Sequence, residues 1–325
     1  MDREKLLTLH RARHLQVMNT FIQAMVRFMD RRKRPRFGDV KNIPIVWPEE
    51  RTFALDRIRL SALHWPGTGT PLVMLHGLNA NPWAWARMAS ILANGRELYV
   101  VAQRGHGGSE VPPQGYGLDE TTADLYALLD RIAPGPIDLA GESWGGKVAM
   151  HFAARHPQRL RALILADPVM PFGFNPLLRT FPSFILAAMM LERSRFRDRE
   201  DMLGAMKRVV YLPLGDEIDR RSWEGRFAPR PNGGYGPRLP DAAHAEIIAT
   251  ALARDISKEL AGCAVPMLLL VPDMSVTFWP GELKRFMRLW RRGTLRRVAG
   301  DHTFVSCNPI QTAQEIDRFL SGQKD

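Results

Sequence analysis

Short runs of apolar residues alternate with stretches of helical spacing along most of the chain after residue 51. The runs are PLVMLHG, ELYVVAQ, PIDLAGES, LRALILADP and VPMLLLVPD. Such runs predict buried strands, and the spacers between them predict helices. Strands that alternate with helices predict a mostly parallel sheet covered by helices on both faces. The earlier stretch FALDRIRLSALHW alternates instead like a β-hairpin.

The alternation is suspended between LILADP and VPMLLLV, over a segment too long for a structureless loop in a compact domain. We therefore predict an inserted helical cap, or lid, over residues 169–255. The remaining α/β core comprises residues 51–168 and 256–325. The cap begins with the apolar stretch FPSFILAAMM and ends near PRPNGGYGPRLPD, whose glycines and prolines suit a hinge or a surface loop.

Residues 1–36 form a third part, which we predict to be a basic amphipathic helix. Its apolar residues recur at spacings of three and four, and they include Leu7, Leu15, Met18, Ile22, Met25 and Met29. Ten Lys or Arg and three Asp or Glu give this segment a net charge of +7, out of +11 for the whole chain. Two roles fit this pattern: a peripheral membrane anchor, or a helix that docks on the core or on a partner subunit.

The composition excludes several other classes of protein. A chain that is 45% hydrophobic and 24% charged is typical of globular proteins. Because the positive charge is concentrated in residues 1–36, we predict no nucleic-acid partner. Cys263 and Cys307 are too few for a disulfide framework or a zinc site, and we predict no metal and no cofactor. No apolar run is long enough to span a membrane, so we expect a cytoplasmic protein, either free or peripheral on the inner membrane face. The sequence leaves the oligomeric state open.

Residues with reactive side chains lie where the predicted strands end. Active-site residues of parallel sheets collect at the carboxyl edge of the strands. The residues at or just after a strand's last position are His76, Arg104, Ser143, Asp167 and Asp273.

Ser143 lies in the stretch DLAGESWGGKVAM, between Gly141 and Gly145. A strand, a Gly-x-Ser-x-Gly turn and a helix form a nucleophile elbow, in which strained backbone angles project the serine hydroxyl away from the sheet. The start of the following helix favours developing negative charge. The sequence therefore predicts that Ser143 is a nucleophile.

With this elbow, the chain resembles the α/β-hydrolase family from about residue 53 to 321. HGLNANPWAW is similar to the family's His-Gly oxyanion loop, QRGHGGS to its Asp-x-Arg-Gly-x-Gly-x-Ser turn, and GDHTFVSCNP to the segment that carries its catalytic histidine. The resemblance implies a Ser-His-acid triad on an α/β sheet.

The position along the chain supports His302 as the general base. His151 and His156 lie on the predicted helix after Ser143, and His244 lies in the cap. His302 lies on a loop between a predicted strand and the closing helix, where it can reach the serine hydroxyl. We expect His76, directly after a strand, to stabilise the oxyanion loop. We assign no chemical role to Arg104 or His106.

The acid is where the chain departs from the family pattern. Ser275 occupies the usual position after the MLLLV strand. Two carboxylates are candidates: Asp167, at the end of the preceding strand, as in some haloalkane-dehalogenase-like members, and Asp273, displaced by two residues from the usual place. We favour Asp167 and keep Asp273 as the alternative.

The remaining site residues are an oxyanion hole and a substrate pocket. The backbone N–H groups of Leu78 and Trp144 are predicted to bind the oxyanion. The side chains expected to line or support the pocket are His76, Asn79, Trp83, Phe181 and Phe184.

A serine nucleophile favours acyl transfer over dehalogenase or epoxide chemistry, which in this family uses an aspartate. We expect cleavage of carboxylic esters, with lipid-like esters or lactones as substrates. An acyltransferase, a carbon–carbon bond hydrolase and a binding protein without activity remain alternatives.

Overall fold

The computed structural model describes residues 40–171, 196–209, 216–230, 233–275, 277, 281–290 and 292–323. The predicted N-terminal helix and the cap residues Phe181 and Phe184 lie outside these ranges. Residues 37–325 form one compact unit.

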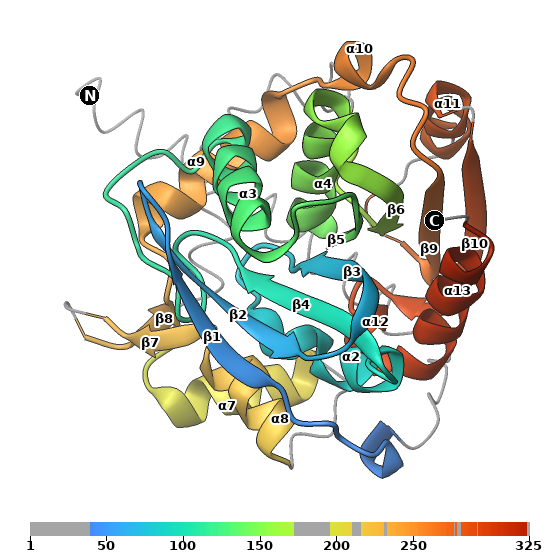
Figure 1. Ribbon diagram of the computed structural model, residues 1–325. Coiled ribbons are helices and arrows are strands. Elements are labelled where there is room, and N and C mark those ends of the chain that lie inside the picture. The colour runs from blue at the N-terminus through green and yellow to red at the C-terminus, as the bar shows by residue number, and fades with distance from the viewer. Residues whose placement is uncertain are drawn as a thin grey trace, which may run out of the picture. The chain divides into compact units, whose positions relative to one another are not determined.

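An eight-stranded sheet organises the core, in the order β1-β2-β4-β3-β5-β6-β9-β10 (Figure 1). Its strands are β1 (Glu49–Ala54), β2 (Arg59–Trp65), β3 (Thr68–Leu75), β4 (Arg96–Ala102), β5 (Ile137–Glu142), β6 (Leu160–Ala166), β9 (Met267–Met274) and β10 (Gly293–Asp301). All pairs from β4 to β10 are parallel, whereas β2 pairs antiparallel with both β1 and β4. This arrangement confirms the predicted hairpin and the mostly parallel sheet.

Helices cover both faces of this sheet (Figure 1). One face packs against α3 (Leu118–Ile132), α4 (Ser143–Arg155), α10 (Ser257–Leu260) and α11 (Glu282–Leu289), and the other against α2 (Ala86–Leu92), α12 (Phe304–Cys307) and α13 (Pro309–Ser321). Successive residues of β3 enter opposite cores: Val73 joins the first and Met74 the second, both fully buried. Because both faces exclude water, the strands are continuous apolar runs. Single 3-10 turns occur at Val40–Asn42, Pro82–Trp85 (η2) and Pro157–Arg159.

The described part of the segment between β6 and β9 contains helices and also a small sheet. Before α10, its described helices are α7 (Arg199–Val209), α8 (Glu217–Glu224) and α9 (Asp241–Ala253), and its strands are β7 (Phe227–Pro229) and β8 (Tyr235–Pro237), which pair antiparallel. The sequence predicted helices here, and the two-residue-period signal of such short strands was too weak to predict the pair.

Polar contacts fasten this segment to the core. The guanidinium of Arg87 on α2 is almost fully buried, and it bonds to the carboxylates of Asp216 and Asp219 at the start of α8. The side-chain amide of Asn81 donates to the carbonyl oxygens of Arg221 (3.0 Å) and Ser222 (3.2 Å). A buried guanidinium needs such carboxylate partners, because an unpaired buried charge is costly.

Lys147 provides a second attachment, at the far end of the segment. Its side chain is fully buried on α4. Its amino group donates to the carbonyl oxygens of Ala251 (2.7 Å) and Arg254 (2.6 Å), where α9 ends. The carbonyl groups at a helix C-terminus lack partners within the helix and favour such a donor. Burial lowers the pKa of Lys147 to about 7.

Lys147 gives the protein a pH-dependent component of stability. Between pH 7 and about pH 10 the unfolded chain binds a proton at this residue and the folded chain does not, so the free energy of unfolding rises with pH, by at most about 1.4 kcal/mol per unit. We expect Lys147→Met to remove this rise. Denaturant titrations at several pH values in this range, compared with the wild type, measure it.

The matched control for this measurement is Lys258→Met, which removes an exposed lysine on α10. A slope that disappears in both variants, or in neither, contradicts the assignment to Lys147.

Candidate active site

Ser143 begins α4 immediately after β5, and its backbone has a φ of 52°. This left-handed conformation is rare for a residue with a side chain, and such strain concentrates at functional sites. The next turn leaves no room for side chains. A Cβ on Gly145 would lie 2.5 Å from the carbonyl oxygen of Leu75, and one on Gly146 would lie 2.6 Å from the ring of Pro168. The glycines thus let α4 pass directly beneath the ends of β3 and β6.

His302 lies in the turn after β10, and its ring bonds to the Asp167 carboxylate. The Nδ1–H group donates to Oδ2 of Asp167 at 2.7 Å. The Nδ1 position therefore carries the proton, and Nε2 is left to accept one. The imidazole is partly exposed, whereas the carboxylate is fully buried. The turn after β6, which carries Asp167, meets the elbow, because the N–H of Val169 donates to the Ser143 carbonyl oxygen at 2.9 Å.

Two hydroxyl groups complete the surroundings of Asp167. Ser275 and Thr277 each donate to Oδ1 at 2.6 Å. Asp167 itself has a φ of 42°, directly after β6. Ser275, which occupies the position where the sequence pattern led us to look for an acid, thus donates a hydrogen bond to the carboxylate of the neighbouring strand. Asp273, the alternative candidate, lies within β9 and is exposed.

The pKa of His302 depends on burial and on the acids around its ring. Burial is the largest single influence and lowers the pKa, but the hydrogen bond and charge of Asp167, together with the charges of Glu142 and Asp301, outweigh burial and raise the pKa above its usual value. The ring is therefore more basic than an ordinary histidine.

The predicted oxyanion loop runs beside Ser143. A Cβ on Gly77 would lie 3.1 Å from the Cβ of Ser143 and 3.7 Å from its Oγ. Leu78 follows directly and packs against the core on the α4 side of the sheet. The Trp144 side chain is 2% exposed and belongs to that same core. Only the backbone of Trp144 is thus placed to serve the site.

His76 supports this loop from within. Its ring is fully buried, and its Nδ1–H group donates to the Gly77 carbonyl oxygen at 2.8 Å. Its Nε2 accepts from the N–H of Gln103 at 3.3 Å, and the Gln103 amide donates to the His76 carbonyl oxygen at 2.6 Å. Burial, followed by the nearby His106, lowers the pKa of His76 well below its usual value. The His76 ring is neutral and has no surface that a substrate can touch, so it does not line the substrate pocket as predicted; it supports the oxyanion loop from beneath.

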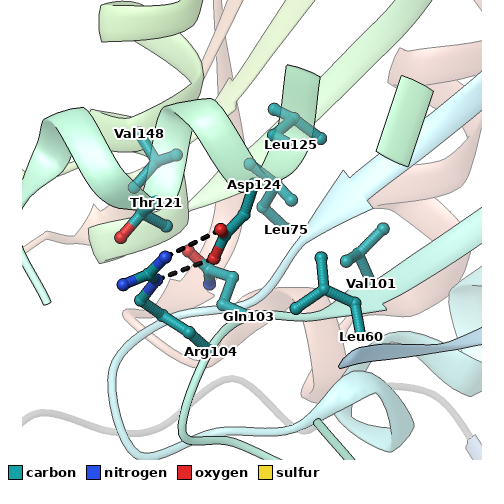
Figure 2. A pocket seen from close by; sticks show the side chains of 9 residues that line it. All are labelled: Leu60, Leu75, Val101, Gln103, Arg104, Thr121, Asp124, Leu125 and Val148. Carbon is teal, nitrogen blue, oxygen red and sulfur yellow. Dashed lines mark hydrogen bonds and ion pairs between the residues drawn. The ribbon is translucent and has the colours of Figure 1, made fainter. Parts of the chain in front are cut away.

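Arg104, the neighbour of Gln103, anchors the turn after β4. Figure 2 shows its guanidinium facing the Asp124 carboxylate of α3, with two bonds of 2.7 Å. The surrounding side chains are mostly aliphatic and come from the sheet, α3 and α4. This bidentate pair fixes the turn that carries Gln103.

Asn79 connects the loop to helix α9. Its backbone has a φ of 57°, and its side-chain amide donates to Nε2 of His244 at 2.7 Å. Its own N–H donates to Nε2 of His106 at 3.3 Å. Burial lowers the pKa values of His106 and His244 to about 4, so both rings are neutral acceptors. The sequence placed His244 in the cap and His106 in a structural turn, and no pattern indicated that both meet Asn79.

Trp83 belongs to a different cluster. Its ring lies 6.0 Å from that of Trp47, and the Arg221 guanidinium lies 4.5 Å above it. The structure thus places Trp83 at the attachment of α8.

Glu142 is a charged residue at the site that the sequence analysis missed. It immediately precedes Ser143 and is buried. Burial raises the pKa of its carboxyl, against the opposing charges of His302 and Arg226. Its place inside the Gly-x-Ser-x-Gly turn was the one available signal.

Comparison with known proteins gives the family. The model of the alpha/beta hydrolase fold matches residues 70–299. The chain belongs to the α/β-hydrolase family. Among the described residues of this α/β-hydrolase, no helix is long and apolar enough to cross a membrane, and no group of three or more His, Cys, Asp or Glu side chains is arranged to hold a metal ion.

Several relatives carry names of hydrolases. Lipase LipV from Mycobacterium tuberculosis is 29% identical over 208 residues, which cover 63% of this chain and 76% of LipV. The 2-(acetamidomethylene)succinate hydrolase of Mesorhizobium japonicum is 25% identical over 78% of this chain and 89% of its own length. The crystal structure of a membrane phospholipase A shares the fold, with a TM-score of 0.60, 21% identity and 99% coverage of both chains. The protein is therefore a hydrolase enzyme of the α/β type.

The pairing of His302 with Asp167 predicts a change that is measurable without substrate. Asp167→Asn removes the charge that raises the pKa of His302 and leaves the lowering effect of burial. We therefore expect the pKa of His302 to fall, as followed by NMR of its ring carbon across a pH titration. Asp273→Asn is the matched control and should leave the pKa unchanged. If the pKa of His302 changes in Asp273→Asn and not in Asp167→Asn, then His302 pairs with Asp273 and the pairing described here is wrong.

Proposed function

We propose that the protein hydrolyses carboxylic esters through an acyl-enzyme, with Ser143 as nucleophile, His302 as general base and Asp167 as the acid that orients the base. The observation that carries the proposal is the 2.7 Å bond from Nδ1 of His302 to a buried carboxylate, in a turn that contacts the strained elbow of Ser143. A serine, a base and a group that orients the base are the parts that nucleophilic catalysis requires.

The reaction takes place in two halves. Oγ of Ser143 attacks the carbonyl carbon while Nε2 of His302 takes the hydroxyl proton. The N–H groups of Leu78 and Trp144 stabilise the oxyanion, and the alcohol leaves with the proton from His302. Water then attacks the acyl-enzyme, with His302 again as base, and the acid product and free Ser143 are released. Asp167 stays ionised throughout and stabilises the imidazolium.

Lipid-like esters are the substrate class that we favour. The apolar start of the cap, which includes Phe181 and Phe184, suits an acyl chain. The names of LipV and of the membrane phospholipase A are consistent with this class. A lactonase, an acyltransferase or a carbon–carbon bond hydrolase would use the same residues with a different acceptor or substrate, and product analysis separates these activities.

Ser143→Ala should abolish turnover of p-nitrophenyl esters from acetyl to palmitoyl, by about 10⁴- to 10⁶-fold in kcat. Asp167→Asn should cost about 10³- to 10⁴-fold, and Asp273→Asn should cost little. A fluorophosphonate should label the wild type and not Ser143→Ala. Circular dichroism checks the fold of each variant. A wild type that neither turns over any ester nor takes the label contradicts the proposal.

We also propose that residues 1–36 bind the enzyme to the surface of an anionic membrane. The net charge of +7 and the spacing of apolar residues support this role.

Flotation with liposomes tests this second proposal. The full chain should float with vesicles that contain phosphatidylglycerol, and a chain lacking residues 1–36 should remain in the dense fraction. High salt should weaken the binding, because it screens the basic residues. Equal flotation of both chains would contradict it.

A further inference from the structure

Arg226 stands apart from the other half-buried and buried arginines of the described chain. Those at Arg87, Arg104 and Arg161 each bond to an aspartate. Within the described residues, no carboxylate lies within 4 Å of Arg226. Its guanidinium donates to the carbonyl oxygen of Ser222 (3.0 Å) and to its hydroxyl (3.4 Å), and it lies 4.0 Å above the ring of Trp223.

Arg226 is held beside the oxyanion loop. It follows Gly225, where a side chain would overlap the Asn81 amide. That amide in turn bonds to the last turn of α8 through the carbonyl oxygens of Arg221 and Ser222. The segment from Asn79 to Asn81 thus packs against the residues around Arg226. This segment begins two residues after Gly77, the loop residue that lies against Ser143.

The charge of Arg226 influences the pKa values of two residues next to Ser143 and the oxyanion loop. It opposes the ionisation of the neighbouring His76 and favours that of Glu142, the residue before Ser143. Burial lowers the pKa of Arg226 to about 10, which leaves the group charged at neutral pH but poorly hydrated. A poorly hydrated guanidinium without an acidic partner binds an anion strongly, because it gives up little water to do so.

A second arginine lies next to Arg226. The N–H of Arg238 donates to the carbonyl oxygen of Arg226 at 2.9 Å. Both residues line a narrow hollow between the oxyanion loop and the strand pair β7–β8, together with Asn79 and His106, and no residue that lines it is acidic. Arg238 is exposed to solvent and His106 is neutral, so Arg226 is the half-buried charge beside the loop.

We infer that Arg226 binds an anionic group, a carboxylate or a phosphate, that the substrate carries near its scissile acyl bond. The inference rests on the proposed ester hydrolysis at Ser143 and narrows its substrates. A carboxylate occurs on a half-ester of a dicarboxylic acid, and a phosphate occurs on a phospholipid or a glycerol phosphate ester. The planar fork of a guanidinium suits the paired oxygens of either group.

Two esters of equal acyl length test the inference: p-nitrophenyl hydrogen glutarate, which is anionic, and p-nitrophenyl valerate, which is neutral. The wild type should favour the glutarate in kcat/KM. Arg226→Gln should lower the ratio of the two kcat/KM values by about 10- to 100-fold, the usual cost of a lost charged hydrogen bond. Arg226→Lys keeps the charge without the fork and should lower the ratio less.

The control variant is Arg197→Gln, which removes the same charge from an exposed site, where the side chain is 85% exposed. It should leave the ratio as in the wild type. An equal loss on both esters in Arg226→Gln overturns the inference and leaves the proposed hydrolysis standing. In that case Arg226 serves only as a distant counter-charge for Glu142. Competitive inhibition of valerate hydrolysis by glutarate, compared with glycerol 3-phosphate, separates the two kinds of anion.

Calorimetric titration of both anions into the wild type and Arg226→Gln decides the inference even without turnover. Binding to the wild type alone supports it, and binding to neither protein, or equally to both, overturns it. Failure of the proposed function has a different signature, namely absence of both ester turnover and fluorophosphonate labelling.

Discussion

The buried carboxylate of Asp167 connects the ends of three neighbouring strands. It follows β6, it accepts hydrogen bonds from Ser275 and Thr277 beyond β9, and it binds His302 in the turn after β10. An ionised group without exposed surface requires several such bonds to offset its lost hydration. The rest of the site depends on this arrangement, because the turn after Asp167 also holds the backbone of Ser143 through Val169.

Burial divides the histidines around the site into two kinds. Burial keeps His76, His106 and His244 neutral, and each accepts a hydrogen bond from the loop or its surroundings. His302 alone among these four meets a carboxylate and becomes more basic. One imidazole near Ser143 is thus more basic than usual, as the proposed general base requires, while its neutral neighbours position the backbone.

The sequence was sufficient to predict features that depend on local patterns. Apolar runs predicted β3, β4, β5, β6 and β9, and the alternating stretch before them predicted the hairpin of β1 and β2. The glycines around Ser143 predicted the elbow, because close packing excludes side chains there. The choice between Asp167 and Asp273 depended on the direction in which each side chain points. The left-handed backbone of Asp167 sets that direction, and residue types alone do not predict it. Contacts between distant segments, such as Asn79 with His244 or Arg226 beside the oxyanion loop, have no local pattern and required the folded chain.

The hydrogen bond between Asn79 and His244 links helix α9, which belongs to the inserted segment, to the oxyanion loop of the core. By position α9 belongs to the segment inserted between β6 and β9, yet its His244 bonds to the loop next to Ser143, and its last carbonyl groups accept hydrogen bonds from Lys147 of α4. For protein engineering, the junction for exchanging this segment with that of another hydrolase therefore lies before Asp241 rather than after Ala253. A graft that ends after the helix would replace part of the catalytic framework together with the substrate-facing residues.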